Sequence, residues 1–196
     1  MNFKFNKIAF CIVLIINSAL LYGQHADCDK MVILKDSIYH ATAISGYGDK
    51  IEFDKSLSLN SQVFEKENNS IWYLITMQDS GEFTFDIKTD NPNTDWDFLL
   101  YSYKKLFCKR IEANKINPTR SNLSRSSQTG LSNNANHETV GPGINENYSK
   151  SITVNKGEQY VLVVNNPKHK NENHTLHLHF PKKAKPIIKK VITEAY

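Results

Sequence analysis

The chain has 196 residues, of which 40% are hydrophobic and 22% are charged, and its formal charge is +4 at pH 7. This composition is ordinary for one folded domain with appendages, and it excludes a disordered or collagen-like chain. The basic residues gather at the C-terminus, where residues 182–196 hold five lysines and one glutamate. We therefore expect no basic face for nucleic acid, and the tail is either a solvated terminus or a contact for an anionic membrane or a partner.

The first 24 residues predict a secretory signal peptide. Two lysines precede an apolar run from Ile8 to Leu21, and a small residue follows at Gly23. The apolar run is shorter than the ~20 residues that a membrane span needs, so an uncleaved anchor is the lesser alternative. The mature chain is then expected to have no transmembrane segment and to be secreted, to the periplasm, the outer envelope or the medium.

Export leaves two cysteines in the mature chain, because Cys11 lies in the signal segment. In an oxidising compartment Cys28 and Cys108 most simply form one disulfide, which would close a loop of about 80 residues. The alternative is a pair of free buried thiols.

Strand patterns recur along the body of the chain, at Asn69–Met77, Glu82–Asp90, Asp97–Tyr103, Lys150–Val154, Gln159–Asn166 and His174–Phe180. The second and last alternate between apolar and polar residues, which is typical of half-buried strands. The third is apolar on both faces and is expected to run centrally. The fourth and fifth flank a turn at Gly157 and are expected to form a hairpin.

A long polar segment, residues 114–147, interrupts the strands. It is either a mobile surface excursion or an ordered loop that shapes a ligand face. Arg120, Asn122 and Arg125 lie within it and are candidate binding residues. The predicted fold is all-β, an antiparallel β-sandwich or jelly roll with one long polar loop. The sandwich is expected over residues 25–181, between the signal peptide (1–24) and the basic tail (182–196).

A succession of short motifs supports this fold. The chain reads "NNSIWYLI", "SGEFTFDI", "DWDFLLY", then Cys108, "RSNLSR", "TGLS", "GPG" and "KGEQYVLVVNN". This order resembles the bacterial pre-peptidase C-terminal domains, which occur in secreted and cell-envelope proteins of Gram-negative bacteria. The resemblance covers about residues 28–181, and the part from "WYLI" to "LLY" is the most specific. It implies a β-sandwich that is usually a non-catalytic appendage.

The stretch "TDNPNTDWDF" crowds oxygen side chains ahead of a buried strand. Asp90, Asn93, Asp95 and Asp97 supply the oxygens that Ca²⁺ prefers, although the spacing matches no fixed loop motif. Turn and strand-end hydrogen bonding is the alternative. A glycosidase pair at Asp95 and Asp97 has no other support. Because these two aspartates share one face of a strand, Trp96 is expected to point into the core.

Histidines near the C-terminus suggest a second metal hypothesis. His177 and His179 share one strand face and could bind Zn²⁺ with His169, or they could simply line a solvent-exposed face. No nucleophile or nucleotide motif is present, so we expect no enzyme. The predicted function is a secreted, non-catalytic binding module of the cell envelope or surface, with Ca²⁺ as a candidate stabiliser and a glycan or an envelope protein as the ligand. The alternatives are a small secreted hydrolase with its site in residues 114–147 and a structural envelope subunit.

Overall fold

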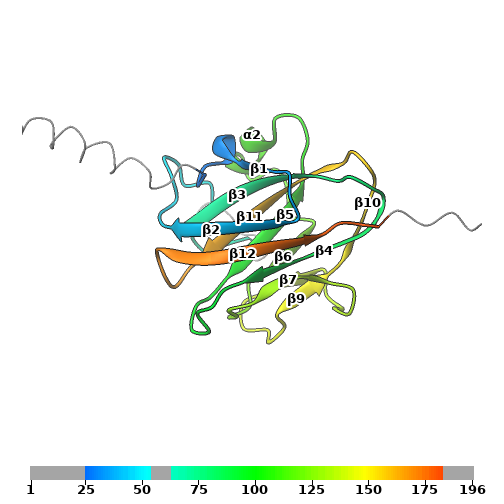
Figure 1. Cartoon of the computed structure of the whole chain (residues 1–196). Helices are drawn as coiled ribbons and strands as arrows, with labels where there is room; N and C mark the ends of the chain where they lie inside the picture. Colours follow the sequence, from blue (N-terminus) through cyan, green and yellow to red (C-terminus); the bar gives the residue numbers. More distant parts are fainter. Residues whose placement is uncertain (1–24, 54–62, 183–196) are drawn as a thin grey trace, which may run out of the picture.

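The computed structural model describes residues 25–53 and 63–182, which form two β-sheets packed face to face (Figure 1). The predicted signal peptide and all but the first residue of the predicted tail lie outside the described residues. No helix in the described ranges is long and apolar enough to cross a membrane.

The two sheets take their strands from all parts of the chain. The first has the order β1 (Val32–Leu34), β3 (Asn69–Thr76), β11 (Gln159–Asn166), β5 (Asp97–Ser102), β6 (Arg120–Asn122) and β8 (Thr139–Val140). The second has the order β2 (Ile38–Ile44), β12 (Glu172–His179), β4 (Gly81–Lys88), β7 (Thr129–Ser132) and β9 (Tyr148–Lys150), with β10 (Ile152–Val154) also paired to β4. The predicted all-β sandwich is confirmed, although neighbours β1–β3, β6–β8 and β7–β9 are parallel rather than antiparallel.

Two details of the prediction are wrong. The strands on either side of Gly157 do not form a hairpin, because β10 pairs with β4 in one sheet and β11 pairs with β3 and β5 in the other. The turn itself is present, and Gly157 has a positive φ of 86°. The polar segment 114–147 is not one long loop, because β6, β7 and β8 all lie within it.

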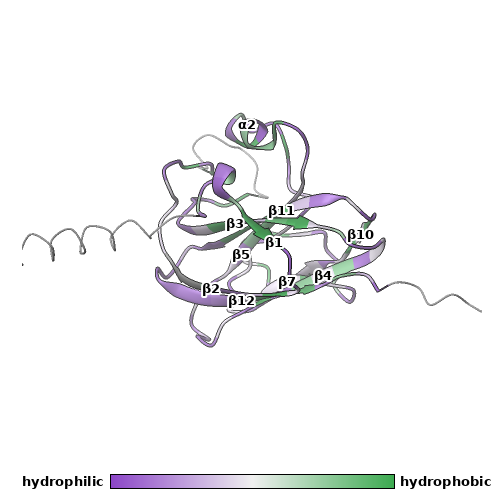
Figure 2. Ribbon diagram, turned by 45° about the horizontal axis from the view of Figure 1, so that its top comes forward, coloured by the Kyte–Doolittle hydropathy of each residue, from purple (hydrophilic) through white to green (hydrophobic). Residues whose placement is uncertain are grey.

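Hydrophobic side chains pack on both faces of the first sheet. One cluster fills the space between the sheets and includes Trp96, which is fully buried as predicted. A second cluster lies on the outer face of the first sheet, under the N-terminal segment and the short helix α2 (Phe107–Glu112). Figure 2 shows hydrophobic colour along β1 and β11, with α2 standing on the side away from the second sheet. This arrangement explains why β5 and β11 are apolar on both faces.

The predicted disulfide between Cys28 and Cys108 is present, with the two Cα atoms 5.7 Å apart. It joins the short 3-10 helix η1 (Cys28–Lys30) to α2. The bridge spans 80 residues and therefore fixes both covering segments over the outer face of the first sheet.

Candidate functional site

Connections between strands gather at one end of the sandwich and form a pocket there, which we call the loop-end pocket. It consists of two adjoining hollows of about 480 and 490 Å³ that share Asp95, Arg125 and Pro167. The walls come from residues just before β3 and from the β4–β5, β6–β7, β8–β9 and β11–β12 connections. The strands hold these connections in register, since β3 and β5 begin at this end, where β11 finishes.

Part of the oxygen-rich stretch before β5 serves turn formation. Asn91 accepts a hydrogen bond from the backbone N–H of Asn93 at 3.0 Å, which is an Asx turn. Thr94 accepts one from the side-chain amide of buried Asn166 at 2.6 Å. The backbone carbonyl of Asn93 receives the ammonium group of Lys168 at 2.8 Å. These residues stabilise the connection.

Asp95 and Asp97 face the same hollow, because they are two residues apart on an extended segment with Trp96 turned inward. Burial raises the pKa of Asp97 well above its usual range, and the neighbouring charge of Asp95 raises it further. Burial also raises the pKa of Asp95, against the opposing effects of the Ser126 backbone N–H and the charges of Lys168 and Arg125. Two carboxyl groups with raised pKa values share a partly dry site.

Among the residues that line the loop-end pocket, two have a buried polar side-chain atom with no hydrogen-bond partner in the described part of the chain. These atoms are Oδ1 of Asp95 and Nδ2 of Asn165, a residue that pairs with Asp97 across β11 and β5. Asn165 is 1% exposed and lines the same hollow, while its Oδ1 accepts the backbone N–H of Asn68. Buried polar groups are almost always satisfied in native proteins, so an acceptor and a donor without partners on residues of one hollow are candidate contacts for a ligand or a water.

Arg125 stands at the rim of the pocket. Its side chain is exposed and forms no hydrogen bond or ion pair with any other residue in the described ranges, although it lies close enough to Asp95 to affect that carboxyl. The guanidinium group offers a planar set of donors suited to a carboxylate, a phosphate or a sugar hydroxyl.

The structure gathers only some of the predicted calcium ligands. Asp95 and Asp97 line one hollow, and Asn93 lines the adjoining one together with Asp95. Asp90 instead lines a separate depression of about 720 Å³ along β2, β4 and β12. The four residues are therefore not one coordination sphere.

The other two predicted binding residues have internal partners. The guanidinium of Arg120 donates to the backbone carbonyls of Thr119, Lys150 and Ser151 and lies 3.4 Å from Glu138. The side chain of Asn122 is fully buried, and its amide donates to Glu146 and accepts from Ser124. Both residues join the short strands of the 114–147 segment to the sandwich and do not face the loop-end pocket.

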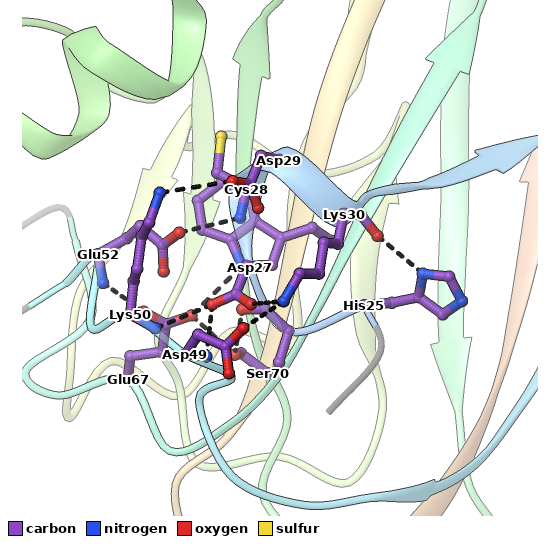
Figure 3. Close-up of polar contacts among 12 residues, drawn as sticks. His25, Asp27, Cys28, Asp29, Lys30, Asp49, Lys50, Glu52, Glu67 and Ser70 are labelled. Atoms are coloured by element: carbon purple, nitrogen blue, oxygen red, sulfur yellow. Dashed lines mark hydrogen bonds and ion pairs between the residues drawn. The ribbon is translucent and has the colours of Figure 1, made fainter. Parts of the chain in front are cut away.

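A second polar cluster, which sequence analysis missed, lies beneath the N-terminal segment (Figure 3). Its centre is Glu67, which is fully buried yet accepts four hydrogen bonds. The donors are the backbone N–H groups of Glu52 and Phe53, the hydroxyl of Ser70 and the indole N–H of Trp72. Burial raises the pKa of Glu67 to about 7 against these hydrogen bonds.

Glu52 completes this cluster and ties it to the disulfide. Its Oε1 accepts the backbone N–H of Cys28 at 2.9 Å, and burial raises its pKa to about 8. Nearby, Asp27 accepts the backbone N–H of Asp49 and the ammonium group of Lys30. We refer to Asp27, Glu52 and Glu67 as the N-terminal acidic cluster. The cluster joins the segments around residues 27–28, 49–53 and 67 through hydrogen bonds. Neither glutamate lines the loop-end pocket.

The predicted zinc residues do not converge. His177 and His179 lie on the outer face of the second sheet, where His179 Nε2 is 2.8 Å from Asp86 Oδ2. His169 lies in the β11–β12 connection. Across the described part of the chain, no three or more His, Cys, Asp or Glu residues are grouped so that they could hold a metal ion.

Comparison with known proteins identifies resemblance in structure alone. No family model and no curated protein sequence matches the chain. Among solved structures, the pre-peptidase C-terminal domain of a collagenase from Bacillus anthracis is similar at a TM-score of 0.37 and 9% identity, over 76% of this chain and 92% of that one. CorA, a surface-associated copper-binding protein of Methylomicrobium album, is similar at 0.38 and 7%, over 76% and 97%.

The first of these structures is a domain of the class that the sequence resembles. At TM-scores below 0.5, neither similarity assigns a family, a ligand or an activity to this chain.

Proposed function

We propose that the protein is a non-catalytic binding module of the cell envelope or cell surface and that the loop-end pocket is its binding site. The observation that carries this proposal is the unfilled hydrogen-bonding capacity of Asp95 Oδ1 and Asn165 Nδ2 beside an exposed Arg125. A ligand with adjacent donor and acceptor groups would satisfy both buried atoms at once. Leaving such atoms unpaired costs about 1–3 kcal/mol each, so their pairing favours the bound state.

A glycan fits this set of groups better than an apolar ligand does. A sugar hydroxyl can donate to Asp95 and accept from Asn165, and Arg125 can bind a neighbouring hydroxyl or a carboxylate of an acidic sugar. A loop of an envelope protein that presents similar groups is the second ligand class. The pocket is open and lies on rigid strand ends, as in binding modules whose loops carry the specificity.

Calcium is proposed as a cofactor of this pocket, with Asp95 and Asp97 as its carboxylate ligands. Burial raises the pKa of both carboxyl groups, and the charge of Asp95 raises that of Asp97 further, so a divalent cation would favour the ionised form of the pair. Ca²⁺ takes six to eight oxygens, so water, backbone carbonyls or ligand hydroxyls would supply the remainder. The cation would make the pocket rigid and would not perform chemistry.

Secretion is proposed from the predicted signal peptide and is supported by the disulfide between Cys28 and Cys108. Such bonds persist in oxidising compartments and are rare in the cytosol. The signal peptide and the disulfide fit the periplasm, the outer envelope and the medium equally well.

The test is a glycan array probed with the chain from residue 25 onward, once with Ca²⁺ and once with EDTA, together with capture of envelope proteins. Three forms are compared: the natural chain, Arg125→Ala and the double variant Asp95→Asn, Asp97→Asn. The proposal predicts one ligand class whose binding both variants reduce at least tenfold. Equal binding by all three forms would place the site elsewhere on the molecule.

A further inference from the structure

The loop and helix that follow β5 are rich in exposed basic residues. Residues 103–115 hold five cationic side chains, listed as Lys104, Lys105, Lys109, Arg110 and Lys115, and one acid, Glu112. All six are exposed, and Glu112 is engaged with Lys50 at 3.4 Å. None of the five cations forms an ion pair with a described residue. We refer to residues 103–115 as the basic tip.

Two large apolar side chains stand out of the basic tip. Leu106 is 58% exposed and Tyr103 is 39% exposed. Leu106 also has a φ of 63°, in the left-handed region that leucine rarely adopts. Leu106 is exposed, strained and flanked by basic residues, so its side chain adds little to the stability of the folded state.

A small hollow lies beside these apolar residues. It has a volume of about 220 Å³ and is lined by Lys104 and Arg110 together with Phe107, Ile116 and the strand end at Ser102. Two cationic side chains on one hollow favour an anionic group, and the volume suits a phosphate headgroup. Phe107 and the disulfide at Cys108 hold the base of the tip on the sandwich.

We propose that the basic tip is a membrane-docking surface that binds anionic phospholipid. Phosphate headgroups would occupy the hollow between Lys104 and Arg110, the remaining cations would face the lipid surface, and Leu106 and Tyr103 would enter the interface. Cations with adjacent exposed apolar side chains are the two components of peripheral membrane binding. Figures 1 and 2 show α2 on the outer side of the first sheet, away from the second sheet.

The geometry separates this surface from the loop-end pocket. Asp97 begins β5 at the pocket, whereas Ser102 ends the same strand at the hollow of the basic tip. Six residues of strand span about 20 Å, so both surfaces could be occupied at once. A module docked through the basic tip would present its pocket away from the lipid.

Flotation with phospholipid vesicles tests the proposal, using the chain from residue 25 onward at low ionic strength. Vesicles contain either phosphatidylcholine alone or phosphatidylcholine with phosphatidylglycerol. We expect binding to the anionic vesicles only, weakened by salt. Each cation near such a surface changes affinity roughly fivefold, so Lys104→Ala with Arg110→Ala should weaken binding about 30-fold. The matched control is Lys35→Ala with Lys156→Ala, two exposed lysines elsewhere, which should retain binding.

The apolar contribution has its own variant. Leu106→Gly removes the side chain and places glycine at a φ of 63°, where it is unstrained. Vesicle affinity should fall roughly tenfold while the Tm stays equal or rises. Ile38→Thr, at another residue that is half exposed, is the control and should bind normally.

Three outcomes would overturn the proposal. The first is equal binding to both vesicle types, and the second is an equal loss of vesicle binding in the tip variant and the control variant. The third is a protein that binds no vesicles but does bind soluble polyglutamate through the basic tip. The last result would make an acidic protein the partner.

Discussion

Two pairs of carboxyl groups lie in the sandwich, and their surroundings differ. In the N-terminal acidic cluster, Glu67 accepts four hydrogen bonds, and Glu52 beside it binds the backbone at Cys28. In the loop-end pocket, Asp97 lies beside Asp95 with a raised pKa, and both line an open hollow. Each pair has one buried oxygen without a partner among the described residues, Oε2 of Glu52 and Oδ1 of Asp95. Both pairs are protonated more easily than free carboxyl groups, and burial is the main cause in each.

The difference shows that a shifted pKa alone does not mark a binding site. The N-terminal pair is shifted because it is enclosed and used by the fold. The loop-end pair is shifted at the wall of an open hollow, next to an unfilled donor on Asn165. Position therefore separates the two pairs: the glutamates lie enclosed under the N-terminal segment, whereas both aspartates line an open hollow that a ligand can enter.

The largest effect is expected from Glu67→Ala. Removing the acceptor leaves four donors without a partner, two of them on the backbone, and should reduce the free energy of unfolding by about 4 kcal/mol. Chemical denaturation measures this loss. Asp97→Ala is the matched change at the other pair and should cost less than half as much; equal losses would show that both pairs are structural.

The two arginines of "RSNLSR" provide a second contrast. Arg120→Ala breaks hydrogen bonds to three backbone carbonyls and should lower the free energy of unfolding by about 2 kcal/mol. Arg125→Ala should change stability by no more than about 0.5 kcal/mol, because the side chain is exposed, yet it should weaken ligand binding at least tenfold. Chemical denaturation measures the stability of both variants, and the glycan array measures their binding. A variant that loses both stability and binding would contradict the separation of a structural arginine from a binding arginine.

Stability should fall as the pH rises through the neutral range. The folded-state pKa values of Glu67 and Glu52, about 7 and about 8, exceed the ordinary 4.5, so the folded state binds protons more tightly than the unfolded state. Their stabilising effect is complete below pH 4.5 and is lost as the pH passes the folded-state values. Buried His174, with its pKa lowered to about 3, opposes this trend only below its ordinary value of 6.5.

The measurement is therefore the Tm between pH 6.5 and pH 8.5. It should fall by about 4 °C in the natural chain and by less in Glu52→Gln, which retains the acceptor for Cys28. Identical slopes in the two proteins would show that Glu52 does not titrate in this range.

The smallest expected effect comes from Asp97→Asn. It removes a buried charge and the repulsion from Asp95, so the free energy of unfolding in EDTA should rise by about 1 kcal/mol at neutral pH. Added Ca²⁺ should stabilise the natural chain and have little effect on the variant. A variant that is less stable in EDTA would mean that the ionised Asp97 is used by the fold.

The sandwich was predictable from sequence where a strand has one apolar face. Phe83, Phe85 and Ile87 alternate with polar residues in β4, and their burial follows that period. The polar strands β6, β7 and β8 were not predictable, because backbone pairing and tertiary contacts bury residues such as Ser121 and Asn122 that carry no hydrophobic period. The β-propensity of individual residues is a weak predictor for strands this short.

The candidate site was predictable only in part. Asp95 and Asp97 follow from the period of the strand, and Arg125 from its place in a polar segment. Asn165 and Glu67 depend on contacts between distant parts of the chain, although an asparagine that ends an apolar run such as "YVLVVNN" is a signal of a buried polar strand end. The disulfide was predictable because the predicted export leaves only one pairing.

The most direct test of the binding proposal is an amide NMR titration of the chain from residue 25 onward with the strongest glycan from the array. The account predicts that shifts concentrate at Asp95, Arg125 and Asn165 and leave Glu52 and Glu67 unchanged. Shifts that centre on the outer face of the second sheet, near His177, with none at Asn165, would contradict it.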